Sequence, residues 1–169
     1  MKAVRSILTA LVLLGISGCL HTQPPVPEEV PPDFRVDYTA GPVHEGAAPH
    51  RFIHIRPMPG EAPAYELVEG LRGKFYDGPG GRPVRKEVIK QKRALSRADA
   101  LSLYRTIEQK RFWRLKALYR TEDVIDGGYE ELKIRAGGRE RTVSLVNADH
   151  ERFQRIVDKL EALVASHTE

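Results

Sequence analysis

Segments of alternating apolar and polar residues predict the first strands of a sheet. In residues 34–40, the apolar side chains of Phe34, Val36 and Tyr38 alternate with polar ones, which is the period-2 pattern of a half-buried strand. Three further segments are rich in strand-forming residues and are separated by turn-forming ones: residues 51–56, 64–69 and 84–95. The pattern therefore predicts four strands before residue 96.

The glycine pair Gly137-Gly138 predicts a β-hairpin between residues 129–136 and 139–146. A two-residue turn of the primed type fixes the register, so Leu132 is expected opposite Val143. The same register gives three more cross-strand pairs: Ile134 with Arg141, Glu130 with Leu145, and Arg135 with Glu140. The apolar pair and the oppositely charged pair fall on opposite faces, as a hairpin with one buried face requires.

Two segments have the periodicity of amphipathic helices. The first is expected to begin at Ser96, whose hydroxyl can cap the amide of Asp99, and to run to about Gln109. Its apolar face contains Leu101, Leu103, Tyr104 and Ile107. The second, from about Asp149 to Ala165, has a longer apolar stripe that consists of Phe153, Ile156, Val157, Leu160, Leu163 and Val164. Between the first helix and the hairpin, the apolar side chains of Phe112, Trp113 and Leu115 predict core packing where the helix ends.

This order of elements predicts a single α+β domain over residues 34–169. We expect an antiparallel sheet of about five or six strands, packed on one face by the two amphipathic helices. A chain of 169 residues, 41% of them hydrophobic, is long enough for one such domain with its own core.

The N-terminus has the layout of a secretory signal peptide. Lys2 and Arg5 form a positively charged start, and the apolar run Ile7–Ile16 follows, with small residues at its end. A membrane-spanning helix needs about 20 apolar residues, so this run is too short to be one. We therefore expect residues 1–18 to be removed as a signal.

The four residues Ile16-Ser17-Gly18-Cys19 resemble the lipobox of bacterial lipoproteins. The resemblance implies that the Cys19 thiol receives a diacylglyceryl group and that the signal is cut just before it. Two acyl chains give stable membrane attachment, whereas one binds reversibly. Cys19 is also the only cysteine, which excludes an internal disulfide and a cysteine-clustered zinc site. Leu20 stands where many inner-membrane lipoproteins of enterobacteria have aspartate, which favours the outer membrane.

Residues 19–33 combine the lipidated cysteine with a proline-rich tether. Residues 20–33 contain five of the twelve prolines, and such sequences form either an extended polyproline II spacer or a linker of no fixed reach. Residues 34–166 in turn resemble the small uncharacterised domains of many bacterial lipoproteins. That resemblance rests on Leu95-Ser96, on Phe112-Trp113-x-Leu115, on the glycine hairpin and on the final helix, and it implies no particular activity.

Charge is concentrated in the middle of the chain. Residues 84–120 contain twelve Lys or Arg and three acidic residues, whereas the tether and residues 121–169 are net negative. A basic segment attracts polyanions. For a secreted protein, this indicates anionic lipid, lipopolysaccharide or an acidic envelope protein rather than nucleic acid. The alternative is a solvated face with no partner, because alternation along a strand distributes charges to both sides.

Three histidines, His44, His50 and His54, are the candidates for metal binding. His50 and His54 are expected on one face of a strand, but about 13 Å apart, since a strand rises about 3.3 Å per residue. No acidic residue at a fixed short spacing completes a ligand set. The acidic group Glu122, Asp123 and Asp126 precedes the hairpin, where carboxylates ordinarily form turns. No catalytic motif or phosphate-binding glycine loop is present.

The sequence thus predicts a non-enzymatic, lipid-anchored protein of the cell envelope that binds another envelope component. No catalytic residue, cofactor or metal ligand is expected, and Cys19 is the one predicted modification site. Two alternatives stay open. One is a lipid-anchored enzyme or metal-binding protein that uses the His44–His54 region, and the other is an inhibitor of a secreted hydrolase that presents a loop from the proline-bearing half.

Overall fold

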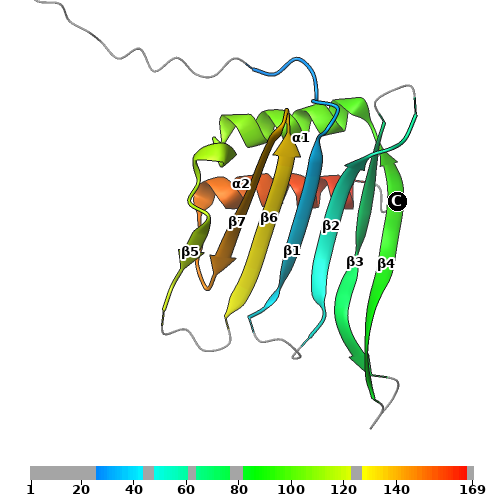
Figure 1. Ribbon diagram of the computed structural model, residues 1–169, viewed down its shortest axis with the longest axis vertical. Helices are drawn as coiled ribbons and strands as arrows, with labels where there is room; N and C mark the ends of the chain where they lie inside the picture. Colours follow the sequence, from blue (N-terminus) through cyan, green and yellow to red (C-terminus); the bar gives the residue numbers. More distant parts are fainter. Residues whose placement is uncertain (1–25, 44–47, 61–63, 77–81, 123–126, 167–169) are drawn as a thin grey trace, which may run out of the picture.

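The computed structural model describes residues 26–43, 48–60, 64–76, 82–122 and 127–166. They form one seven-stranded sheet with strand order β4-β3-β2-β1-β6-β7-β5, and both α-helices lie on the same face of it (Figure 1). The α+β prediction, with two helices on one face of a sheet, is therefore confirmed. Cys19, His44, Asp123 and Asp126 lie outside the described residues.

The elements follow the chain as four strands, a helix, a short edge strand, a hairpin and a helix. Their bounds are β1 Arg35–Pro42, β2 His50–Pro57, β3 Tyr65–Tyr76, β4 Pro83–Leu95, α1 Arg97–Gln109, the 3₁₀ turn η1 Phe112–Arg114, β5 Leu118–Arg120, β6 Gly128–Ala136, β7 Arg139–Val146 and α2 Glu151–Ala165.

The prediction of five or six antiparallel strands was wrong in number and in direction. A seventh strand, β5, pairs in parallel with β7 over three residues, so the sheet is mixed. A segment of three residues is too short to show a period-2 pattern. It forms a strand because the chain leaving α1 runs back along the exposed edge of β7, where the Ser144 amide donates to the carbonyl of Ala117 at 2.9 Å.

The hairpin and the first helix start follow the sequence prediction closely. All four cross-strand pairs predicted for β6 and β7 are present, including Leu132 opposite Val143. The hydroxyl of Ser96 accepts from the amide of Asp99 at 3.1 Å and caps α1 as expected. Arg135 and Glu140 are opposite each other as expected, but their charged groups have other partners. Glu140 contacts Lys133 at 2.9 Å, and Arg135 lies 3.6 Å from Asp33.

The core lies between the helices and the face of the sheet that they cover. The predicted stripe of α2 is buried completely, from Phe153 to Val164. On α1 the buried residues are Ala100, Leu103, Tyr104 and Ile107, so the helix is rotated slightly from the expected face and Leu101 is only half-buried. Phe112 and Leu115 are buried, whereas Trp113 lies at the rim. There its indole donates to Glu108, and Arg139 stacks on its ring.

On the opposite face of the sheet, the described residues form no helix, and polar cross-strand contacts cover the strands. Lys92 pairs with Glu66 at 3.0 Å, and Arg72 pairs with Glu87 at 2.6 Å. Opposite charges on neighbouring strands stabilise such a solvated face. Among the described residues, neither helix is long and apolar enough to cross a membrane.

Candidate functional site

Residues 26–33, which were expected to belong to the tether, lie against the domain. The carboxylate of Asp33 accepts from the amides of Gly137 and Gly138 at 2.7 and 2.9 Å, in the turn of the β6–β7 hairpin. The carbonyl of Pro31 accepts from the Tyr65 hydroxyl at 3.2 Å, and that of Pro27 from Arg105 at 2.8 Å. Only residues 20–25 separate this docked segment from Cys19.

The docking fixes where the N-terminal segment enters the domain. Besides the backbone contacts, Glu29 pairs with Arg97 at 3.0 Å, and Val30 packs on the core. The turn at Gly137-Gly138 has positive φ angles of 59° and 73°, which point both amides outward where a carboxylate can accept from them. The first described residues therefore lie at the upper end of the sheet in Figure 1.

A cavity of about 380 Å³ lies near the other end of the sheet. It forms where β3 ends, β4 begins and β2 begins, and its lining is Ala48, His50, Arg72, Gly73, Lys74, Arg85 and Lys86. Lys74 lies nine residues beyond Tyr65 on β3, so the cavity and the docked segment are about 30 Å apart at roughly 3.3 Å per residue. We call this cavity the distal pocket.

Positive charge dominates the distal pocket. Among the described residues that line it, the charged ones are Arg72, Lys74, Arg85 and Lys86, and none of these described residues is acidic. Arg72 is held in place by Glu87 at 2.6 Å and by the ring of Phe52, whose centre lies 5.1 Å from the guanidinium carbon. The ammonium of Lys86 lies 5.1 Å from the centre of the Phe75 ring. The register of β3 and β4 places Arg72, Lys74 and Arg85 on one face of these strands, whereas Lys86 lies on the Phe75 face, so three of the four cations can attract an anion to the same side.

The absence of a side chain at Gly70 on β3 leaves room for the ring of Phe52. A Cβ at Gly70 would lie 2.6 Å from the ring of Phe52, so this ring packs directly over the glycine backbone. Phe52 is buried to 1% exposure even though it points to the face without helices. The ring and the guanidinium of Arg72 thus form a stacked pair that orients one cation of the distal pocket.

The two described histidines do not form a metal site. Nδ1 of His54 lies 2.5 Å from the carboxylate of Asp37, and its Nε2 faces Arg72 at 3.4 Å, so both ring nitrogens have neighbours. Burial raises the pKa of Asp37, but the contact with His54 outweighs it, and the net pKa is lowered. His50 instead points into the distal pocket. Within the described ranges, no group of three His, Cys, Asp or Glu residues could hold a metal ion.

His50 is flanked by a tyrosine of β6. The ring centres of His50 and Tyr129 are 6.3 Å apart, and the Tyr129 hydroxyl donates to Glu131 at 2.6 Å. Burial, followed by the Glu131 carboxylate, raises the pKa of Tyr129 to about 12. This tyrosine therefore stays neutral at physiological pH and gives His50 an aromatic neighbour, not a charged one.

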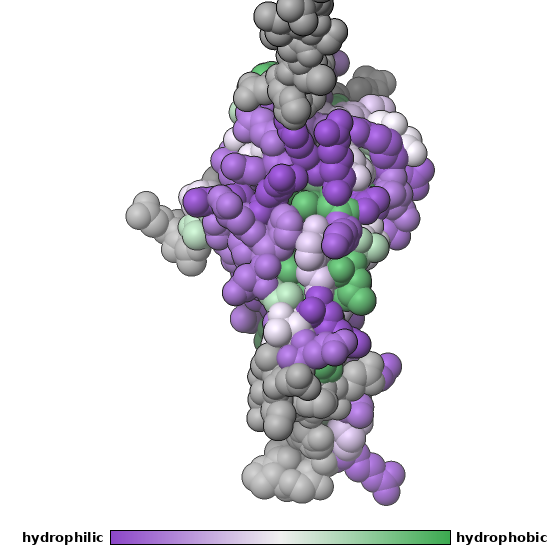
Figure 2. Space-filling view, turned by 90° about the vertical axis from the view of Figure 1, so that its left-hand side faces the viewer, coloured by the Kyte–Doolittle hydropathy of each residue, from purple (hydrophilic) through white to green (hydrophobic). Residues whose placement is uncertain are grey.

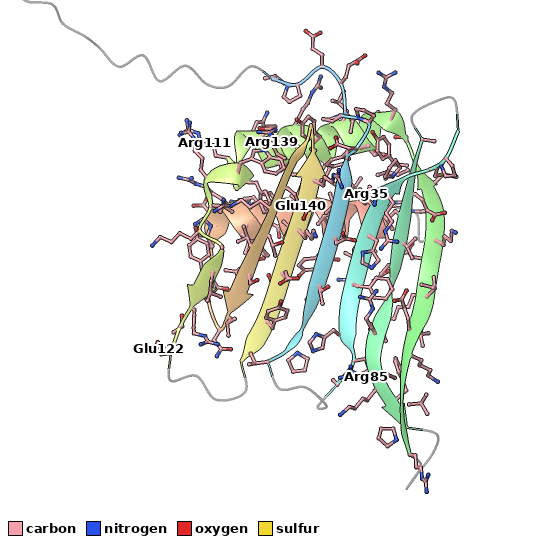
Figure 3. All side chains as sticks on the ribbon, viewed as in Figure 1. Arg35, Arg85, Arg111, Glu122, Arg139 and Glu140 are labelled. Carbon is pink, nitrogen blue, oxygen red and sulfur yellow. The ribbon has the colours of Figure 1, made fainter. Side chains whose placement is uncertain are left out.

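The basic segment 84–120 does not form one patch. Helix α1 crosses the sheet between its two edge strands, so the cations of β4 and those that follow α1 lie at opposite edges. Figure 3 shows Arg85 at the lower right and Arg111 at the upper left. Several of the intervening cations are used structurally, as when Arg93 donates to the carbonyl of Leu163 on α2.

Sequence reasoning missed two of the cations in the distal pocket. Arg72 and Lys74 lie in the second half of β3, beyond residue 69 where the strand was expected to end. Arg72 and Lys74 alternate with Gly73, but glycine is uncommon inside strands. Gly70 and Gly73 therefore interrupt the alternation of apolar and polar residues that predicts a strand. Protein-family models give no match to the chain, and curated proteins include no similar sequence.

Proposed function

We propose that this protein is a non-enzymatic, lipid-anchored module of the cell envelope that binds an anionic envelope component in the distal pocket. The anchor is the acylated Cys19, in the outer membrane, and the folded part is held by it at the membrane surface. The observation that carries the proposal is the placement of the docked N-terminal segment and the distal pocket at opposite ends of one sheet.

The docked segment supports an anchored orientation. Six residues, 20–25, span at most about 20 Å as polyproline II at 3.1 Å per residue. A chain attached to a bilayer at Cys19 would therefore hold the upper end of the sheet close to the lipid. The distal pocket would then face away from the membrane, where it is accessible to a soluble or opposing envelope component.

The chemistry of the distal pocket supports an anionic ligand. Arg72, Lys74 and Arg85, which share one face of β3 and β4, line a space of about 380 Å³. Cavities of roughly 300–1,000 Å³ accommodate small molecules, so the space matches a single anionic group of a larger envelope molecule such as lipopolysaccharide. No arrangement of nucleophile, base and oxyanion donors accompanies these cations among the described residues, which favours binding over catalysis.

Mass spectrometry of protein purified from its native host tests the anchor. We expect a diacylglyceryl-modified Cys19 at the N-terminus and membrane fractionation that is lost in Cys19→Ala. An intact Met1, or a bare thiol on a freely soluble product, would overturn the anchor.

Titration with purified lipopolysaccharide tests the distal pocket. The double variant Lys74→Gln plus Arg85→Gln is expected to bind more weakly by about ten-fold or more, since each lost cation near an anionic surface costs about 1 kcal/mol. The matched control, Lys90→Gln plus Arg120→Gln, removes the same charge outside the pocket. Equal loss in both variants would show non-specific attraction and overturn the pocket assignment.

A further inference from the structure

A second basic cluster lies where the end of α1 meets the start of α2. A depression of about 340 Å³ is lined there by Gln109, Lys110, Arg111, Glu151, Arg152 and Arg155. We call this group the helix-junction cluster. It is separate from the distal pocket, and Figure 3 shows Arg111 toward the upper end of the molecule, whereas Arg85 lies at the lower end.

Within the part of the chain that the structure describes, the cations of the helix-junction cluster outnumber its acidic groups. The depression brings together four cations and one carboxylate. Within the described residues, none of these four cations forms an ion pair, in contrast to Arg139, which pairs with Glu108, and Arg51, which pairs with Glu161. Like charges gathered on one surface repel one another until an anion binds between them.

The backbone adds to the positive potential of the cluster. His150 stands at the N-cap of α2 but makes no side-chain cap hydrogen bond, so no cap residue occupies the free amides of the first turn. The N-terminal end of a helix carries a partial positive charge that favours anions. Arg111, the last residue before η1, has a left-handed φ of 53°, an uncommon conformation for a side chain of this size.

The cluster also lies close to the docked N-terminal segment. Arg105 holds the carbonyl of Pro27 at 2.8 Å, and Lys110 follows five residues later, about 7.5 Å further along α1 at 1.5 Å per residue. Pro27 is eight residues after Cys19, a distance of at most about 29 Å even in a fully extended chain. The helix-junction cluster is thus within reach of the surface to which Cys19 would be attached.

We propose that the helix-junction cluster binds the phosphate groups of anionic phospholipids in the membrane that holds the anchor. The proposal rests on the proposed function only for the location of that membrane. Open depressions lined by arginine and lysine suit phosphate, because guanidinium groups bind its oxygens in pairs. Figure 2 views the side of the molecule that carries β5, and hydrophilic side chains cover most of the upper part of that side.

Vesicle sedimentation tests the proposal with the chain from residue 20 to residue 169, which keeps every described element but lacks the acylated cysteine. Vesicles of phosphatidylcholine with 30% phosphatidylglycerol are compared with vesicles of phosphatidylcholine alone. We expect binding to the anionic vesicles only, and a strong decrease as salt is raised. The double variant Arg152→Gln plus Arg155→Gln is expected to bind ten- to thirty-fold more weakly, at roughly 1 kcal/mol per cation.

Two further variants locate the effect. Lys90→Gln plus Arg120→Gln removes equal charge elsewhere and is expected to change binding less than three-fold. Equal loss in this control would overturn the proposal in favour of general charge attraction. A larger loss in Lys74→Gln plus Arg85→Gln would overturn it by moving lipid binding to the distal pocket. Circular dichroism of each variant confirms that the fold is kept.

Inorganic phosphate distinguishes a lipid site from a free-anion site. Millimolar phosphate at constant ionic strength is expected to leave vesicle binding unchanged, whereas full displacement would overturn the assignment to lipid. The protein in this assay carries no acyl chain, so the assay is independent of the anchor. A negative result would not contradict lipidation of Cys19, and the absence of lipidation at Cys19 would not contradict vesicle binding by the helix-junction cluster.

Discussion

Asp33 provides the sharpest test of whether residues 26–33 are part of the folded domain. Its carboxylate accepts from the amides of Gly138 and Gly137, and Arg135 lies 3.6 Å away. Replacing Asp33 by alanine removes both hydrogen bonds and leaves the two outward-facing amides to water. We expect the docked segment to detach more readily while the sheet and helices keep their structure.

The magnitude follows from the geometry of the two bonds. A hydrogen bond to a charged group stabilises a protein by about 1.5–3 kcal/mol where it is shielded from water. The Asp33 side chain is 29% exposed, so water competes for both amides and screens the charge. We therefore expect Asp33→Ala to weaken docking by about 1–2 kcal/mol in total, which is roughly a five- to thirty-fold increase in the detached population.

The effect has a defined pH dependence. The amide of Gly138, and then that of Gly137, lower the pKa of Asp33 below its usual value of 3.8. A carboxyl group whose pKa is lower in the folded state stabilises that state fully above its unfolded pKa, and the contribution disappears as pH falls through the folded value. The difference between the wild-type protein and Asp33→Ala should therefore be complete at pH 7 and shrink steadily below about pH 4.

Limited proteolysis with a glutamate-specific protease measures the detached population, because Glu28 and Glu29 lie within the docked segment. Cleavage there is expected to be five to thirty times faster in Asp33→Ala, on the order of the free-energy change above. The control Asp158→Ala removes an exposed carboxylate of α2 and should leave the cleavage rate unchanged. Equal rates in wild type and Asp33→Ala would refute the docking argument.

Three further substitutions test the packing and the helix-junction cluster. Gly70→Ala should lower the free energy of unfolding by about 1–3 kcal/mol in urea denaturation, because its Cβ would clash with the carbonyl oxygen of Val88 and would lie 2.6 Å from the Phe52 ring; unchanged stability would contradict this close packing. Arg51→Leu should lower the free energy of unfolding by about 1–3 kcal/mol, because it leaves the carboxylate of Glu161 without its arginine partner. A gain in stability would contradict that role of Arg51. Arg111→Gly should raise unfolding stability by up to about 1 kcal/mol by removing a left-handed arginine, yet weaken binding to anionic vesicles, so a parallel loss of stability and binding would contradict the reasoning.

The sequence was informative wherever one local signal decided the structure. The two glycines of the hairpin turn determine the register of β6 and β7, and the capping hydroxyl of Ser96 determines where α1 starts. The apolar stripe of α2 predicted its buried face without error, because a helix with one strongly apolar side has one way to pack on a sheet.

The missed features depend on contacts between distant parts of the chain. Strand β5 exists because the edge of β7 offers unpaired backbone groups, which no pattern within residues 118–120 reveals. The second half of β3 extends through Gly70 and Gly73, residues that weaken a strand unless a neighbour fills the space. At Gly70 the ring of Phe52 fills it, a contact between two strands that the local pattern of neither strand reveals.

The candidate site was missed for the same reason. The histidines drew attention because their spacing is visible in the sequence, but the distance between chemical groups depends on which strands become neighbours. The adjacency of β2 and β3 lets Arg72 reach His54, and that of β3 and β4 places Lys74 beside Arg85 at one cavity. Charge counting found the excess of cations but not their division between two edges of the sheet.

Helix α1 explains why that division matters. It begins beside β4 and ends beside the chain that leads into β5, and it holds the N-terminal segment through Arg97 and Arg105 on the way. The helix-junction cluster begins directly after it, whereas the distal pocket lies on the far ends of β3 and β4. Lengthening residues 20–25 would therefore move the whole domain away from an anchoring bilayer without altering either site. Contact of the cluster with lipid should then weaken with added length, while binding in the distal pocket should not, because only the former depends on the distance between the domain and the membrane.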